Sequence, residues 1–138
     1  MEVPMGSRTH IVSHFGPHSG KLVTDSGAVV ALGHEAGTFA PYELLLGGLS
    51  YCLFRTFESL AEKMQLAFEK LDMDIEGVKR DDKISTLETC MIRVSVKGAS
   101  NEEKLTKAFE IATRYCSVYH TLTKVATLQW SISFSPSL

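Results

Sequence analysis

The chain has 138 residues, of which 44% are hydrophobic and 22% are charged, and its formal net charge is −2. This length and composition predict a single globular domain, residues 1–138, that is large enough to bury a core. The nearly balanced charge gives no reason to expect nucleic acid or an anionic membrane surface as a partner.

The start of the chain, residues 1–10, has no basic segment followed by an apolar core, so no secretion signal is indicated. The longest apolar stretch, residues 44–54, is too short to span a bilayer. Three cysteines are an odd number and too few for a secreted disulfide scaffold. We therefore expect a cytoplasmic protein in which any disulfide is transient and catalytic.

The first 40 residues predict short strands separated by turns. β-prone runs occupy residues 9–15, 21–23 and 28–32. Asp25-Ser26-Gly27 is a tight-turn signal between the second and third runs. Together they predict a small antiparallel meander.

A long amphipathic helix is predicted to follow, beginning at Pro41, a residue that suits a first helical turn. Its apolar stripe recurs at spacings of three and four and consists of Leu46, Leu49, Leu53, Phe57, Leu60 and Met64. Gly47 and Gly48 each cost about 1 kcal/mol relative to alanine inside a helix. We therefore expect a break or a close contact at the glycines, and then a long helix to about Gln65.

Alternating apolar and polar residues predict two further strands, over residues 71–76 and 90–97, joined as a hairpin. A final strand is predicted over residues 128–134. Between the hairpin and this strand, Ser100 and Glu103 form a capping-box pair that opens another helix.

The predicted order is β-meander, long helix, β-hairpin, helix, strand, which defines an α+β protein. The long helix is amphipathic in a domain too small to cover it on all sides. A second subunit is a natural way to cover it.

The cysteines are the residues of this chain that point most directly to a function. Cys52 lies within the long helix, and Cys116 lies where a helical pattern ends at a turn or a new short helix beginning near Ser117. Free cysteines are often small buried hydrophobes, so both can be core residues. Alternatively, they form a redox pair, in which Cys52 needs a lowered pKa and N–H groups of the new helix favour a Cys116 thiolate. Cys90 lies on the apolar face of a predicted strand, with Ile92 and Val94, so we interpret it as a structural residue.

Two motifs around these cysteines resemble those of one family, the OsmC/Ohr organic hydroperoxide reductases. The first motif places Pro41, Glu43 and Leu44 at matching distances before Cys52. The second motif comprises Tyr115, Cys116, Ser117, Val118, Thr121 and Leu122. The order of elements matches as well, so the resemblance covers essentially the whole chain.

This resemblance implies an OsmC-like fold, with antiparallel β-sheets around a long central helix, in an intertwined homodimer with active sites at the subunit interface. It implies a peroxidase of oxidative stress defence. Cys52 is then the peroxidatic residue, which attacks an organic hydroperoxide, and Cys116 resolves its sulfenic acid as a disulfide. An external dithiol reduces that disulfide, with no metal or cofactor.

Glu43 is the third candidate catalytic residue, as a general base near Cys52. A carboxylate at a helix start is also explained by the helix dipole alone.

The chain departs from the family at one point. Strongly active members pair the first cysteine with an arginine of the meander and with a glutamate ten positions before the cysteine. Here that position holds Tyr42, and the meander turn has no arginine. Lys21, His18 or Arg55 are the remaining candidates for a cation that lowers the pKa of Cys52. The sequence is closer to the divergent OsmC-like branch.

Two alternatives stay open. A dimer of the same fold that binds a lipid or an aromatic molecule, with incidental thiols, fits the same pattern. Cys116 and His120 are also four residues apart and can both ligate zinc from one face of a helix, although no second pair has matching spacing.

Overall fold

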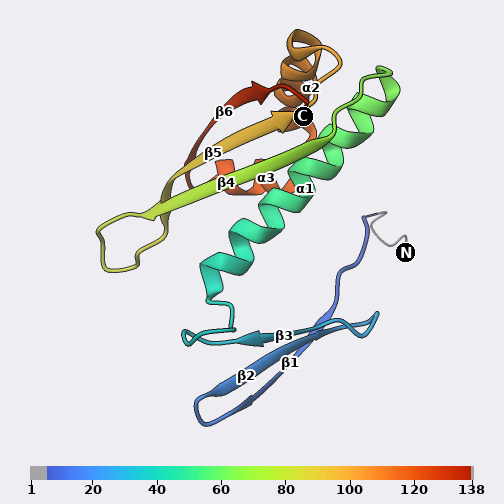
Figure 1. Ribbon diagram of the computed structural model, residues 1–138. Coiled ribbons are helices and arrows are strands. Elements are labelled where there is room, and N and C mark those ends of the chain that lie inside the picture. Colours follow the sequence, from blue (N-terminus) through green and yellow to red (C-terminus); the bar gives the residue numbers. More distant parts are fainter. Residues whose placement is uncertain (1–5, 138) are drawn as a thin grey trace, which may run out of the picture. The chain divides into compact units, whose positions relative to one another are not determined.

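The computed structural model describes residues 6–137 and divides the chain into two compact units, a first up to Leu45 and a second from Leu46 onward. The elements are β1 (Ile11–Gly16), β2 (Ser19–Thr24), β3 (Val29–Leu32), α1 (Pro41–Lys63), β4 (Lys70–Lys79), β5 (Leu87–Lys97), α2 (Glu102–Tyr115), α3 (Ser117–Thr123) and β6 (Thr127–Ser135) (Figure 1). The predicted α+β order is confirmed, with α3 in addition. The prediction of one domain over residues 1–138 stays a prediction.

The first unit contains the predicted antiparallel meander, in the order β1-β2-β3. The turn between β2 and β3 includes Gly27, whose φ of 94° is accessible to glycine at no steric cost. No described side chain of this unit is buried, and Phe15 is 75% exposed. A three-stranded sheet that leaves its apolar residues in contact with water lacks a core of its own.

Helix α1 runs without interruption from Pro41 to Lys63, so the expected break at Gly47 and Gly48 is wrong. Nothing among the described residues lies within 4 Å of a Cβ built at either glycine, so the expected close contact is absent there as well. The helix tolerates the glycines because burying a side chain such as that of Leu53 stabilises it by about 2 kcal/mol. It ends just before Gln65, whose φ of 57° is left-handed.

The second unit contains a sheet in the order β4-β5-β6. The predicted hairpin is confirmed, because β4 and β5 pair antiparallel. In contrast, β5 and β6 pair in parallel, where only antiparallel sheets were expected. The reason is the connection, because α2 and α3 lie between the two strands, and a long helical crossover carries the chain back to the end of the sheet where β5 began.

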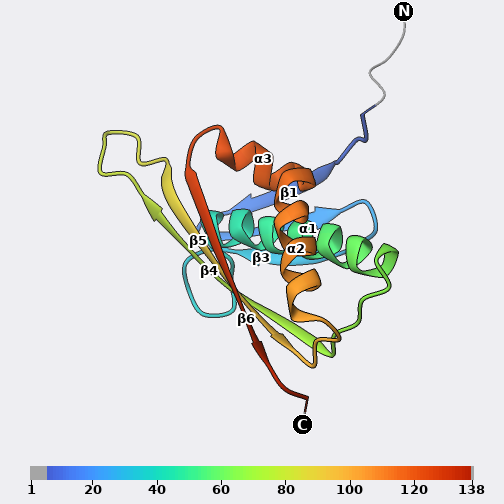
Figure 2. The ribbon, with the colours of Figure 1, turned by 90° about the horizontal axis from the view of Figure 1, so that it is seen from above.

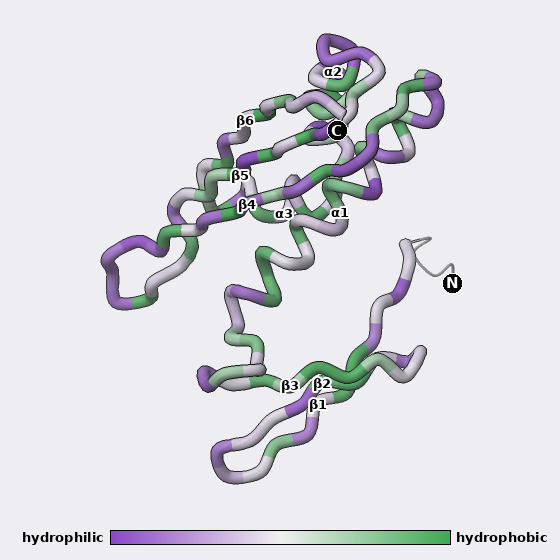
Figure 3. The backbone as a smooth tube through the Cα atoms, in the orientation of Figure 1, coloured by the Kyte–Doolittle hydropathy of each residue, from purple (hydrophilic) through white to green (hydrophobic). Residues whose placement is uncertain are grey.

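One face of this sheet is apolar and the other polar, as the alternating colours of β4, β5 and β6 in Figure 3 illustrate. Ile75, Ile92 and Trp130 stand side by side on the apolar face. Helices α1 and α2 lie over that face (Figure 2). The ring of Phe109 joins the layers, with its centroid 5.7 Å from that of Phe57 and 5.0 Å from that of Trp130.

The buried core follows the predicted stripe of α1 at Leu49, Leu53 and Phe57, whereas Met64 is exposed and Ala61 is buried in addition. Its largest fully buried side chains are Phe57, Phe109, Leu49, Leu53, Ile92, Leu105, Val94, Val96, Cys90 and Cys116. All of them belong to the second unit. The sheet, α1 and α2 therefore fix the places of Cys52 and Cys116.

The start of α2 differs from its prediction. The N-cap is Asn101, whose side chain accepts a hydrogen bond from the Lys104 N–H at 3.0 Å. Ser100 was expected to cap the helix in a box with Glu103, but its hydroxyl accepts from the Ala67 N–H instead. Asparagine caps as well as serine does, so the helix begins one residue later.

Among residues 6–137, no helix is both long and apolar enough to cross a membrane. The sequence interpretation of the chain start rests partly on residues 1–5, which lie outside the described residues.

Candidate active site

Cys116 is the single residue between α2 and α3. It ends α2, with its N–H donating to the Ala112 carbonyl at 2.9 Å, and it is the N-cap of α3. Its sulfur accepts a hydrogen bond from the Tyr119 N–H at 3.5 Å. The side chain is fully buried. The new helix considered at Ser117 is confirmed, and Cys116 lies at its start.

Cys52 lies in the middle of α1 and is half-buried. Its sulfur is 3.8 Å from the hydroxyl oxygen of Ser117, the first residue of α3. The fold therefore brings the start of α3 against α1, and the Cys116 thiol is among the groups that act on the pKa of Cys52 there. Two of the three predicted site residues are together.

The surroundings of Cys52 favour its thiolate. Burial acts to raise the pKa of the thiol, but hydrogen bonds outweigh burial and lower the pKa below its ordinary value. In order of effect, the hydrogen-bond partners are the backbone N–H of Val118, the Cys116 thiol, and the hydroxyl and backbone N–H of Ser117. These are groups of the second unit that lie 64 or more positions further along the chain.

The surroundings of Cys116 act in the opposite direction. The pKa of its thiol is raised to about 11, mainly by burial and in part by the neighbouring Cys52, while N–H groups of Tyr119 and Val118 act against this. The N–H groups at the start of α3 were expected to favour a Cys116 thiolate. They do act in that direction, but burial of Cys116 outweighs them, so the pKa of its thiol is raised. The Cys116 thiol is the proton donor of the pair.

Glu43 lies in the first turn of α1, in the first unit. Its carboxylate accepts a hydrogen bond from the Ala40 N–H at 2.8 Å, which caps the helix. The structure thus gives Glu43 a local role, and its catalytic role stays a prediction. Cys90 is buried on β5, and burial raises the pKa of its thiol, in line with a structural residue.

The candidate cations are placed as follows. The guanidinium of Arg55 donates to the Tyr51 hydroxyl at 3.3 Å and lies 3.8 Å from a Glu58 carboxylate oxygen, so its contacts are with its own helix. His18 stands in the turn between β1 and β2 with a left-handed φ of 63°, and Lys21 lies exposed on β2, both in the first unit.

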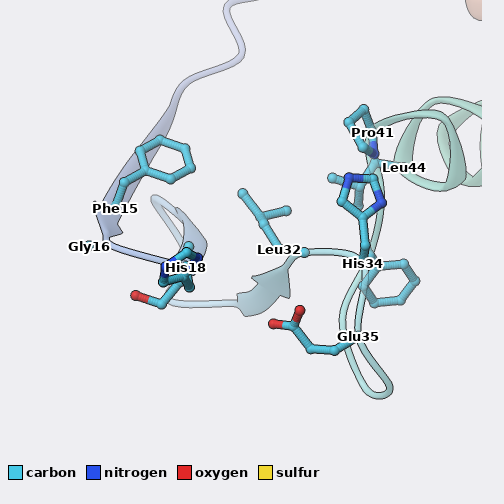
Figure 4. Close-up of a pocket in the computed structure, with 12 residues that line it drawn as sticks. Phe15, Gly16, His18, Leu32, His34, Glu35, Pro41 and Leu44 are labelled. Atoms are coloured by element: carbon cyan, nitrogen blue, oxygen red, sulfur yellow. The ribbon is translucent and has the colours of Figure 1, made fainter.

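Each unit has a pocket. In the second unit, a groove of about 670 Å³ lies between α1 and α2, lined by Arg55, Thr56, Ser59, Leu60, Lys63, Ile111 and Tyr115. Thr56 follows Cys52 by one turn, and its hydroxyl donates to the Cys52 carbonyl at 2.9 Å. In the first unit, a pocket of about 610 Å³ is lined mainly by apolar side chains such as Phe15 and Leu32, with His18, His34 and Glu35 among them (Figure 4).

The hydrogen bond of His120 counts against the alternative that Cys116 and His120 ligate zinc. Its ring nitrogen Nε2 bonds to the Arg114 carbonyl oxygen. That nitrogen is therefore occupied. Within residues 6–137, no three or more His, Cys, Asp or Glu residues gather where a metal could be held.

Sequence reasoning missed the groups that lower the pKa of Cys52. Ser117 was considered only as a helix start, and Val118 only as part of a motif. Their position directly after Cys116 was the available signal, because the first N–H groups of a helix lack partners within it.

The fold and the site define an α+β protein with two neighbouring thiols, one within α1 and one between α2 and α3, of which the first has a lowered pKa and the second a raised pKa. The sequence model of the OsmC-like protein family matches residues 33–131 of the chain. The chain belongs to this family, as its two cysteine motifs predict.

Solved structures with the same fold include an OsmC-like protein from Mycoplasma pneumoniae, with 20% identity, a TM-score of 0.81, and coverage of 97% of this chain and 100% of that one. An organic hydroperoxide resistance protein from Elizabethkingia anophelis has 14% identity, a TM-score of 0.74, and coverage of 95% and 100%. One from Bacillus subtilis has 14% identity, a TM-score of 0.71, and coverage of 92% and 98%. No curated protein matches the sequence. At these sequence identities, the structural similarity shows that the fold is shared.

Proposed function

We propose that this protein is a thiol-dependent peroxidase that reduces organic hydroperoxides in oxidative stress defence, in the cytoplasm. The observation that carries the proposal is the opposite change in the two thiols, with the pKa of Cys52 lowered and that of Cys116 raised. A thiolate is the nucleophile and a thiol is not, so Cys52 is the residue equipped to attack. Two relatives in fold are named organic hydroperoxide resistance proteins.

In the first step, the Cys52 thiolate attacks one peroxide oxygen of ROOH. An S–O bond forms and the O–O bond breaks, so the sulfur is oxidised by two electrons and the peroxide is reduced. The departing alkoxide takes a proton and leaves as ROH. Cys52 becomes a sulfenic acid, Cys–SOH.

In the second step, Cys116 attacks the Cys52 sulfur. An S–S bond forms, the S–O bond breaks, and the hydroxyl leaves as water with the proton of the Cys116 thiol. The Cys52 thiolate is one cause of the raised pKa of Cys116, and that charge is gone once Cys52 is a neutral sulfenic acid. Oxidation of Cys52 thus lowers the pKa of Cys116 at the step in which Cys116 has to react.

An external dithiol closes the cycle. One of its thiolates attacks the Cys52–Cys116 disulfide to form a mixed disulfide, and its second thiolate displaces the protein thiol. Both protein thiols return reduced and the reductant leaves as a disulfide. No metal or other cofactor takes part in these three steps.

The proposal includes a homodimer with the active site at the subunit interface. It is supported by the first unit, whose described side chains are all at least partly exposed. Its exposed large apolar residues are Ile11, Val12, Phe15, Val29 and Phe39. Apolar surface of this extent marks an interaction site.

Single cysteine variants test the proposal, with cumene hydroperoxide as the substrate and no added reductant. The wild-type protein should consume about one equivalent and form the Cys52–Cys116 disulfide. Cys52→Ser should consume none. Cys116→Ser should consume about one equivalent and stop as a sulfenic acid, which dimedone traps. Mass spectrometry identifies each product.

Cys90→Ala is the matched control, because Cys90 is a buried thiol that takes no part in the proposed steps. It should consume peroxide as the wild-type protein does. Robust consumption by Cys52→Ser would refute the proposal.

A second candidate function is a dimer that binds a lipid or an aromatic molecule without catalysis. The observation that favours it is the pocket of about 610 Å³ in the first unit, with its largely apolar lining. The two functions differ in what they require of Cys52, because only the peroxidase needs a thiolate there.

A further inference from the structure

The corner between α2 and α3 is held by a side chain that the proposed chemistry does not use. We propose that His120 is a positioning residue, whose ring fixes this corner so that the first N–H groups of α3 stay against the Cys52 sulfur. The inference concerns the same site as the proposed function, and it adds a residue that neither cysteine motif required.

His120 ties together both sides of Cys116. Its ring nitrogen Nε2 bonds to the carbonyl oxygen of Arg114, in the last turn of α2. Its backbone N–H donates to the Cys116 carbonyl at 3.0 Å. A carbonyl oxygen can only accept, so the hydrogen of the first bond is carried by Nε2. One residue of α3 therefore forms hydrogen bonds both to the last turn of α2 and to Cys116.

The corner needs these hydrogen bonds because α3 is short. It has seven residues, and its only buried side chain is that of Leu122. A helix of this length is marginal without tertiary contacts. Cys116 joins it to α2 in an extended conformation, with φ −75° and ψ 115°, and the last carbonyls of α2 have no partner within their own helix. The ring of His120 supplies a partner for one of them.

The orientation of α3 contributes to the ionisation of Cys52, together with the Cys116 thiol. The N–H groups of Ser117 and Val118 and the Ser117 hydroxyl all act from the first turn of α3. The Ser117 oxygen is 3.8 Å from the Cys52 sulfur, which is long for a hydrogen bond even to sulfur. A small rotation of α3 would therefore break this contact and lengthen the others. Loss of the His120–Arg114 bond permits that rotation.

The test compares His120→Gln with His120→Met. The two side chains are unbranched, similar in length and suited to helices, but only glutamine has an N–H to give to the Arg114 carbonyl. Alkylation by iodoacetamide across pH, followed for the Cys52 peptide by mass spectrometry, reports the pKa of Cys52. His120→Met should raise that pKa and slow alkylation at pH 7 by about threefold or more, whereas His120→Gln should keep the wild-type profile.

Thr123→Ala is the control. It removes another hydrogen bond of α3, from the Thr123 hydroxyl to the His120 carbonyl, and leaves the link to Arg114 in place. Its Cys52 profile should match the wild type. A wild-type profile in His120→Met, or an equal rise in His120→Met and His120→Gln, would overturn the inference.

A second measurement needs no variant. Nitrogen-15 spectra of the wild-type protein should show the His120 hydrogen on Nε2, and hydrogen on Nδ1 alone would also overturn the inference. Both readouts report ionisation or tautomer and neither requires peroxide turnover. If Cys52→Ser still consumed peroxide, the proposed function would fail while these results decided the role of His120 independently.

Discussion

At the scale of single residues, the site works by giving two identical side chains different surroundings. Cys52 is half-buried and receives hydrogen bonds, which lower the pKa of its thiol, whereas Cys116 is fully buried, which raises its pKa to about 11. The Cys116 thiol stays protonated and is one of the groups that stabilise the Cys52 thiolate. In the proposed peroxidase, this asymmetry assigns the attacking role to Cys52.

The pH dependence of alkylation follows from these directions. As pH rises, Cys52 should become reactive first, below the pH at which an ordinary thiol ionises, and Cys116 should stay unreactive until the pH approaches 11. Ser117→Ala removes one donor to the Cys52 sulfur, so it should raise the pKa of Cys52 by about half a unit. Alkylation of each cysteine peptide at a series of pH values measures both effects.

Ser50→Ala is the matched control on α1, because the Ser50 hydroxyl donates to the Gly47 carbonyl of its own helix. It should leave the Cys52 profile unchanged. The hydrogen-bond account would be untenable if Ser117→Ala also left the Cys52 pKa where it was. A Cys52 pKa at or above the ordinary value in the wild-type protein would favour the binding function.

At the scale of elements, α1 and α2 show which local features matter to a helix. Two exposed glycines do not interrupt α1, since its buried face is continuous from Leu49 to Ala61. The start of α2 depends on one side chain, that of Asn101, which satisfies the Lys104 N–H. A glycine inside a helix and a lost cap each cost about 1 kcal/mol, so the buried face of α1 is what offsets its two glycines.

Replacing the cap tests this view of α2. Asn101→Ala should lower the free energy of unfolding by about 1 kcal/mol, because the Lys104 N–H loses its acceptor. Urea denaturation at a fixed protein concentration measures the change. Glu103→Ala is the companion variant, since a capping box would require Glu103, and its effect should be smaller. A larger effect at Glu103 than at Asn101 would contradict the observed cap.

At the scale of the whole molecule, burial is uneven. The buried side chains of the described chain lie in the second unit, whereas the meander of the first unit exposes apolar residues such as Phe15 and Val29. A sheet with an apolar face is stabilised when another layer buries that face. A second copy of the chain would supply that layer, in agreement with the proposed homodimer.

This assembly makes a prediction about Phe15. The wild-type chain should sediment as a dimer, and Phe15→Asp should shift it toward the monomer, since the charge would have to be buried at the interface. His14→Asp is the control, because His14 is an exposed polar residue of the same strand on the face opposite to that of Phe15. Analytical ultracentrifugation over a range of concentrations measures the shift. A monomeric wild-type protein, or a Phe15→Asp variant as dimeric as the wild type, would disprove the arrangement.

Much of the fold was open to prediction because it depends on local periodicity. Alternation along β4 and β5 gave their faces and their hairpin, and the stripe of α1 gave its buried side. The parallel pairing of β6 with β5 was not predictable in this way, because a strand pattern has no direction. The direction of β6 depends on the end of the sheet at which the α2–α3 connection returns the chain.

The sequence by itself determined the family, through the spacing of residues around Cys52 and Cys116, and it determined which segments form the core. Only the tertiary structure decided how the two thiols ionise. The pKa of Cys52 depends on donors at Ser117 and Val118, and that of Cys116 depends on complete burial. Spacing along a chain is a local property, whereas ionisation depends on the solvent and the hydrogen-bond donors that folding brings to an atom.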